Sequence, residues 1–436
     1  MPLPRQAPRS RRPRPGLTLG LAGLLIVAYG LLVVVSHRVD EQARRRWVAA
    51  GGSLEELVRR YPSRETNALA GQVEAVAAGM GLRLRPNWEQ GGVVPAAPAA
   101  AGWASVRELL GDALAATLQR DHPRIDPLPR EVAAYLDRQA GALARLRALL
   151  AGPVAPLWRR ELERGPRARL PNLPGQIGLQ QVLTLDALEA IRRGDRARAE
   201  ADLEASWWLG TSLREDPVLI EQWGSMVVLH FQAGVLRRLA PAPDRWRRRL
   251  ASVGGRRLFL DALRHEVAAL SKIDPTRLTG DLSLPERLFG ALAAPYLRIS
   301  HADALGRWQQ ALDGLEARDS LCPPVGRDTL DWRVAAPPWW NRLEDSLQAG
   351  FSASRRLLHV QLDLELTRQW LALDELRREA GSGPLRLPPA GDSEACPGER
   401  WIPTVLPDGG VALRLSRALP PPPGGWAPPL RYRTGP

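Results

Sequence analysis

The chain has 436 residues, of which 44% are hydrophobic and 25% are charged, a composition typical of a folded globular protein. The formal net charge is +13, but Lys272 is the only lysine and the arginines are interleaved with acids, as at residues 192–196. Interleaved charge is typical of a solvated helix face, so no nucleic-acid binding is expected.

The first predicted element is a transmembrane helix at residues 16–36. The run from Gly16 through Leu25 to Val35 holds no charged residue and is rich in Leu, Val and Ala. Twenty residues at 1.5 Å each span about 30 Å, the thickness of the hydrocarbon core of a bilayer. The sequence therefore predicts a single anchor, which contacts lipid through residues 16–35, in a bacterial inner membrane.

The orientation of this anchor is predicted from the basic tail at residues 1–15. The tail carries five arginines and no acid, and four arginines follow the anchor between residues 37 and 46. The difference is small, but a short basic tail is hard to translocate, whereas a long domain crosses largely regardless of its charge. We therefore expect a cytoplasmic N-terminus and a periplasmic body.

Two other interpretations of the N-terminal segment stay open. A cleaved signal peptide would have an apolar region of about 7–15 residues and a small-x-small cleavage site, and residues 16–38 offer a longer run and no good site. A body that faces the cytoplasm would use its arginines on acidic partners or lipid headgroups.

Residues 37–90 are predicted to form juxtamembrane helices. Ser53 and Glu56 have the spacing of a capping box, which begins a short helix that Pro62 ends. A second helix is predicted from Glu65 to Met80. Residues 91–102 are rich in Ala, Pro and Gly and are predicted to be a linker.

Residues 103–380 are predicted to form an all-α domain, because hydrophobic residues recur at helical spacing and no strand-like alternation is present. Helices are expected at 103–120, 130–150, 153–164, 176–192, 195–213, 217–239, 244–271 and 284–317.

The segment 183–217 resembles one tetratricopeptide helical hairpin. Ala187, Gly194, Ala199 and Ser206 fall close to the spacing of that repeat, in which a glycine turn and small residues let two helices pack tightly. Thr211 stands where proline is expected, and no second copy follows, although an array needs at least about three repeats. The segment predicts an antiparallel helix pair.

The longest predicted helix runs from about 339 to 380. Its hydrophobic residues, among them Leu358, Leu362, Leu366 and Trp370, form one apolar stripe. Such a stripe is expected to be buried against neighbouring helices, and a homodimer seam is the alternative.

Residues 381–436 are predicted to form a Pro-rich tail with a small β-hairpin. Two apolar runs, 401–406 and 411–416, flank an Asp-Gly turn. Pro403 predicts that the first of these strands lies at an edge. A lone hairpin is marginal in water, so we expect it to pack on the helices.

The two cysteines, Cys322 and Cys396, are predicted to form a disulfide, which a periplasmic location would allow. The alternative is two free thiols, because the sequence does not show how close the two residues lie.

Motifs for catalysis and cofactors are absent from the sequence. His265-Glu266 begins like a zinc-protease motif, but Ala269 stands where the second histidine is required. The sequence contains no phosphate-binding glycine loop and no nucleophile elbow around Ser225. We therefore expect no catalytic residue, no metal and no cofactor.

Paired carboxylates offer one enzymatic alternative. Glu189, Glu204 and Glu221 are expected on neighbouring helices, and three tryptophans could stack on sugars. A glycosidase needs two acids about 5–10 Å apart. The tryptophans are Trp207, Trp208 and Trp223. Ordinary helical packing explains the same residues, so a hydrolase acting on peptidoglycan is the second choice.

The order of segments resembles that of bacterial membrane-anchored helical proteins. It comprises a basic tail, an anchor helix, an entry at Tyr61-Pro62, a helical body and a long helix before a Cys-Pro-Gly-x-x-Trp segment at residues 396–401. The resemblance is one of organisation and implies no activity. The function that we expect is binding or scaffolding in the cell envelope, with a protein partner.

Overall fold

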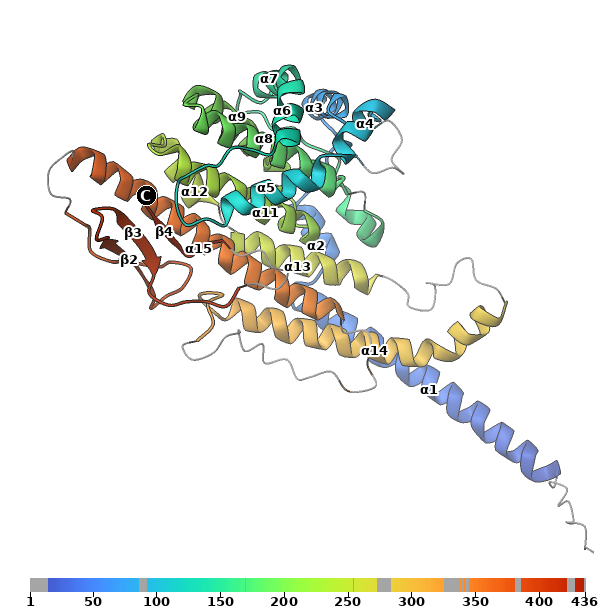
Figure 1. The fold of residues 1–436 in the computed structure, drawn as a ribbon. Coiled ribbons are helices and arrows are strands. Elements are labelled where there is room, and N and C mark those ends of the chain that lie inside the picture. The colour runs from blue at the N-terminus through green and yellow to red at the C-terminus, as the bar shows by residue number, and fades with distance from the viewer. Residues whose placement is uncertain are drawn as a thin grey trace, which may run out of the picture.

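The computed structural model describes residues 15–85, 92–168, 170–253, 255–272, 284–324, 338, 341, 345–380, 386–421 and 428–434. The described chain is mostly helical and ends in one small antiparallel sheet. A body of packed helices lies on one side of the molecule, the sheet lies at one end of it, and α1 projects away from the other end (Figure 1).

The predicted anchor lies in α1, a 35-residue helix from Pro15 to Ala49. Leu25 and Val35 are 62% and 46% exposed, as are most of the large apolar side chains described between residues 24 and 35. This is the one helix of the described chain that is long and apolar enough to cross a membrane, and it lies near the N-terminus.

Side-chain caps begin the next two helices. In α2 (Leu54–Arg60), the Ser53 hydroxyl accepts a hydrogen bond from the Glu56 backbone N–H at 3.4 Å, which is one of the two bonds of a capping box, whereas the Glu56 carboxylate accepts from Arg60 Nη2 at 3.2 Å. In α3 (Ala68–Gly79), Asn67 Oδ1 accepts from the Ala70 N–H at 2.9 Å, so this helix begins three residues later than predicted.

The helix predicted at 153–164 is wrong. Residues 154–161 are extended, and a short 3-10 helix, η1 (Leu162–Arg167), follows. The extended segment pairs with the chain before α3, where Arg64 and Arg160 exchange backbone hydrogen bonds of 3.1 and 2.9 Å. In this segment, backbone hydrogen bonds to a distant part of the chain replace those of a helix.

The helical body contains α4 to α13. Their bounds are α4 (Ala97–Ala104), α5 (Arg107–Leu118), α6 (Arg130–Arg138), α7 (Ala140–Leu149), α8 (Leu173–Arg192), α9 (Arg196–Leu209), α10 (Thr211–Glu215), α11 (Leu219–Leu239), α12 (Asp244–Ser252) and α13 (Gly255–Ser271). Helix α4 begins inside the segment 91–102, expected to be a linker, and extends two residues beyond it; a proline in its first turn favours that start.

Helices α8 and α9 form the antiparallel pair predicted from the segment 183–217. Gly194 has a φ of +79°, which suits the turn, and Asp195 caps α9 by accepting from the Arg198 N–H. Across the pair, Ser206 Oγ donates to Gln180 Oε1 at 2.6 Å.

Two long helices, α14 (Leu284–Glu316) and α15 (Asp345–Ala380), complete the helical part. The apolar stripe predicted for α15 is buried: Leu358, Leu362, Leu366 and Trp370 are at most 4% exposed. Helix α15 packs on α11 and α12, while α14 packs on α1.

The predicted hairpin is present and is extended to four strands. The order is β1 (Gly391–Asp392), β2 (Arg400–Val405), β3 (Val411–Leu415) and β4 (Arg431–Arg433), all antiparallel. Strand β2 is not at an edge, but β1 pairs only with residues 400 and 401, so no β1 carbonyl faces Pro403, which has no N–H to donate.

The sheet packs on α15, as expected for a hairpin that is marginal alone. Trp401 Nε1 donates to Glu365 Oε2 at 3.0 Å, and the rings of Tyr432 and Trp370 meet edge to face with centroids 4.6 Å apart. The predicted disulfide between Cys322 and Cys396 is confirmed, with Cα atoms 5.0 Å apart. It joins the segment after α14 to the turn before β2.

Candidate functional site

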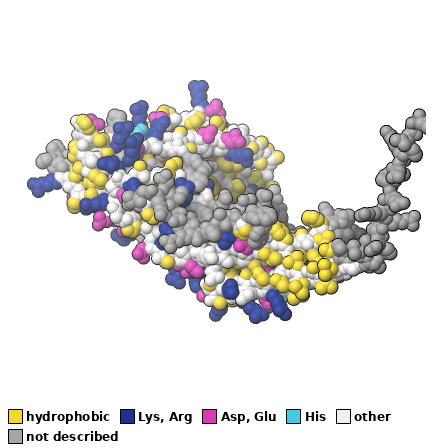
Figure 2. Space-filling view, turned by 90° about the horizontal axis from the view of Figure 1, so that it is seen from below, with side chains coloured by type: hydrophobic (Ala, Val, Ile, Leu, Met, Phe, Trp, Pro, Cys, Tyr) yellow, Lys and Arg dark blue, Asp and Glu magenta, His cyan; other side chains and the backbone are white. Residues whose placement is uncertain are grey.

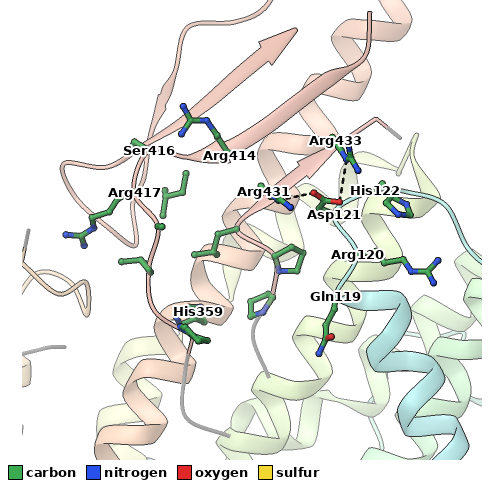
Figure 3. A pocket seen from close by; sticks show the side chains of 17 residues that line it. Gln119, Arg120, Asp121, His122, His359, Arg414, Ser416, Arg417, Arg431 and Arg433 are labelled. Carbon is green, nitrogen blue, oxygen red and sulfur yellow. Dashed lines mark ion pairs between the residues drawn. The ribbon is translucent and has the colours of Figure 1, made fainter. Parts of the chain in front are cut away.

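A cavity of about 570 Å³ lies between the C-terminal sheet, the loop after α5 and one face of α15 (Figure 3). Its lining side chains are mostly basic or polar. They are Gln119, Arg120, Asp121, His122, His359, Arg414, Leu415, Ser416, Arg417, Ala418, Leu419, Pro421, Pro428, Pro429, Leu430, Arg431 and Arg433.

Asp121 joins the two walls of this cavity, which come from opposite ends of the chain. Its carboxylate pairs with Arg431 Nε at 2.9 Å and with Arg433 Nε at 3.5 Å (Figure 3). Its backbone carbonyl accepts from the Arg433 N–H at 2.7 Å. Strand β4 is therefore fixed against the loop after α5, and the cavity is formed between them.

Positive charge exceeds negative charge around the cavity. Five arginines line it, and Asp121 is the one acid among the lining residues. Arg120 pairs with Asp126 at 2.6 Å, and Arg417 pairs with Glu399 at 3.2 Å. These three acids leave two of the five guanidinium charges uncompensated. Arg414 is exposed and has no ion pair within the part of the chain that the structure describes.

The two histidines of the cavity add polarity but little charge at neutral pH. Burial lowers the pKa of His122, and burial likewise lowers the pKa of His359. His359 Nε2 lies 3.0 Å from the Pro420 carbonyl oxygen, to which it donates as the neutral ring. The arrangement suits an anionic ligand that is held by guanidinium groups.

A second cavity, of about 300 Å³, lies near the end of α9. Trp207, Trp208 and Arg214 line it, and the Arg214 guanidinium lies 3.9 Å from the centre of the Trp207 ring. Two of the tryptophans considered as sugar-stacking surfaces therefore border a cavity. The third, Trp223, faces Arg356 at 5.1 Å.

The three carboxylates considered for a hydrolase line neither of these cavities. Hydrogen bonds from Arg192 lower the pKa of Glu189, to which Arg193 also binds. Burial would raise the pKa of Glu204, but Arg249 overcomes it and lowers that pKa. Burial and the neighbouring Asp216 raise the pKa of Glu221.

A buried cluster in the core contains a histidine and an aspartate that the sequence did not single out as a pair. His230 Nδ1 lies 2.7 Å from Asp363 Oδ2, and Arg237 Nη1 donates to Asp363 Oδ1 at 2.6 Å. All three side chains are at most 2% exposed, so a substrate has no access to them. The cluster therefore stabilises the contact between α11 and α15.

Among the described residues, no three His, Cys, Asp or Glu side chains are grouped so as to hold a metal ion. The cavity residues that sequence reasoning missed are Asp121, Arg414, Arg431 and Arg433. Nothing in their spacing indicated a site, because about 290 residues separate Asp121 from Arg414. No protein-family model, curated protein or solved structure matches the chain.

Proposed function

We propose that this chain is a single-pass protein of a bacterial inner membrane whose periplasmic body binds an acidic segment of another envelope protein. The observation that carries the proposal is the cavity beside β4, which five arginines line and where the three acids paired with them leave two positive charges uncompensated. Its volume of about 570 Å³ is within the usual range for ligand pockets, about 300–1,000 Å³. Carboxylates are the natural partners of guanidinium groups.

The location is supported by three features. Helix α1 is long and apolar enough to cross a membrane. The arginine-rich tail before it favours a cytoplasmic N-terminus. The Cys322–Cys396 disulfide suits an oxidising compartment such as the periplasm.

Topology is tested with a thiol placed on the body. Val154 is 60% exposed, and both native cysteines are in the disulfide, so Val154→Cys adds one accessible thiol. A membrane-impermeant maleimide should label this variant in intact cells. Labelling only after the inner membrane is opened would favour the cytoplasm-facing alternative.

Binding is tested with a fluorescent tetraglutamate peptide and the full-length protein in detergent. Fluorescence anisotropy should show binding that Arg414→Ala weakens about tenfold, because one charge-assisted contact contributes about 1.5 kcal/mol. The matched control is Arg145→Ala, since Arg145 is an exposed arginine of α7 outside the cavity. Equal weakening by both variants would contradict a site at the cavity.

The tetratricopeptide resemblance and the hydrolase stay proposals of second rank. The α8–α9 pair is one unit, and a peptide-binding array needs at least about three. The hydrolase predicts that the Glu221→Gln variant loses peptidoglycan cleavage, which dye release from labelled sacculi would measure.

A further inference from the structure

Helix α14 runs beside the predicted anchor helix, parallel to it and at a nearly constant sequence offset. Tyr29 of α1 contacts Ala291 of α14, and Asp40 contacts His301. The two contacts are separated by 11 residues on α1 and by 10 on α14, since the sequence offsets are 262 and 261. A residue of α14 therefore lies at about the level of the α1 residue 262 positions before it.

The change from apolar to polar sequence occurs at the same level on both helices. The apolar run of α1 ends at Val35, and by this offset its counterpart on α14 is Leu297. The run of α14, residues 288–297, contains no charged residue and also ends at Leu297, where Arg298 follows. Beyond it, His301 Nδ1 and Asp40 Oδ1 lie 2.5 Å apart. Both helices thus cross one polarity boundary together.

A hydrogen bond between the helices lies inside the apolar region. Pro295 has no N–H, so the carbonyl of Ala291, four residues earlier, has no helical donor. The Tyr29 hydroxyl donates to this carbonyl at 2.6 Å. An unpaired carbonyl or hydroxyl in hydrocarbon is costly, and this bond satisfies both groups at once.

The side of this run that faces away from α1 is exposed and apolar. Phe289 is 74% exposed and Leu292 is 66% exposed, whereas Ala294 is 7% exposed. This exposed pair places the run outside the core, and hydrophobic side chains form a continuous group on the part of the molecule that narrows toward the start of α1 (Figure 2). A ten-residue run, about 15 Å long, is too short to span a bilayer but suits a re-entrant or interfacial segment.

We propose that residues 288–297 of α14 form a second membrane contact, inserted beside α1 into the leaflet nearer the folded body, with Phe289 and Leu292 against lipid. This inference rests on the proposed anchoring by α1. At the offset of 262, Phe289 lies at the level of Val27, about eight residues or 12 Å inside the end of the apolar run of α1. The body is then held by two helices, which restrict its rotation about the anchor.

The test uses nitroxide labels on the full-length oxidised protein in phosphatidylcholine vesicles. Labels at Phe289→Cys and Leu292→Cys are compared with a label in the anchor, Leu25→Cys, and with one on the exposed body, Val154→Cys. Paramagnetic resonance measures the accessibility of each label to oxygen, which concentrates in lipid, and to a nickel chelate, which stays in water. We expect the oxygen-to-nickel ratio at both α14 positions to be several-fold above that at Val154→Cys.

The four labels separate the possible failures. If Leu25→Cys reports lipid while both α14 labels match Val154→Cys, the second contact is wrong and the anchor stands. If Leu25→Cys also reports water, the proposed anchoring fails and this inference fails with it. Two α14 positions are used so that a local disturbance at one of them does not decide the result.

Discussion

Asp186 and Asp202 are held together by one guanidinium nitrogen. Nη1 of Arg147 donates to Asp186 Oδ2 at 2.9 Å and to Asp202 Oδ1 at 2.8 Å, and both carboxyl groups are fully buried. Arg198 also binds Asp186, with Nε 3.0 Å from Oδ2. The pair joins α8 to α9, and α7 contributes Arg147.

Replacing the two aspartates by asparagine should have unequal effects. Burial and the neighbouring Asp186 raise the pKa of Asp202, which favours its neutral form, and a neutral amide is a close substitute for that form. At pH 7 we expect Asp202→Asn to change the free energy of unfolding by less than about 1 kcal/mol. Asp186→Asn should cost about 3 kcal/mol, because two arginines lose their carboxylate. Urea unfolding of the full-length protein in detergent measures the free energy of unfolding of each variant. Equal losses for the two variants would show that Asp186 and Asp202 do not differ in charge.

The Arg237–Asp363 pair should show strong coupling in a double-mutant cycle. Both side chains are fully buried, so removing either one leaves an uncompensated charge, and we expect Arg237→Ala and Asp363→Ala each to cost about 3–5 kcal/mol. The double variant should cost clearly less than the sum of the two.

The matched control for that cycle is the pair Arg378–Asp374 on the same helix. Its atoms lie 3.1 Å apart, but 48% of the arginine side chain is exposed. Solvent screens such pairs, and a coupling of about 0.5 kcal/mol or less is expected. Similar coupling in both cycles would show that burial does not strengthen the Arg237–Asp363 interaction.

Stability should fall in mild acid because His265 is buried. Burial lowers the pKa of this histidine to about 4, whereas the ordinary value is 6.5. Above pH 6.5 the ring is neutral in the folded and in the unfolded state, so its burial does not lower the free energy of unfolding. As the pH falls from 6.5 to 4, only the unfolded chain gains the proton, and about 3 kcal/mol is lost. For His265→Gln, the free energy of unfolding should change less steeply with pH between 4 and 6.5. An unchanged slope would contradict the prediction.

Reduction of the disulfide should destabilise the protein. The two cysteines are 74 positions apart, and closing such a loop contributes about 4 kcal/mol in the chain-entropy model. The urea midpoint should fall on addition of reductant, and the double variant Cys322→Ser/Cys396→Ser should match the reduced protein. A midpoint that does not respond to reductant would show that the bond restrains little of the unfolded chain.

The sequence predicted the elements that are specified by neighbouring residues, namely the buried stripe of α15 and the hairpin of β2 and β3. The stripe on α15 is a helical pattern of four buried residues between Leu358 and Trp370, and the hairpin follows from Asp408-Gly409, where Gly409 has a φ of +79°. Strands β1 and β4 were not predicted, because they have two and three residues and are defined by their partners.

The errors came from contacts between distant segments. Residues 157–164 contain Leu, Arg and Glu, which favour a helix, but the segment is bound by Asn67: its Nδ2 donates to the Ala155 carbonyl at 2.9 Å, and its Oδ1 accepts from the Leu157 N–H at 3.2 Å. The arginine-lined cavity could not be predicted for the same reason, since Asp121 and Arg433 meet only in the folded protein.

The binding of β4 to the loop after α5 also sets an order of assembly. Residues 119–122 are synthesised early, but the cavity wall that faces them lies within residues 414–421 and 428–433, and β4 completes it. A chain that ends before β4 therefore lacks one wall of the cavity. Under the proposed function, such a chain would not bind the acidic segment, because the site is complete only when β4 is docked.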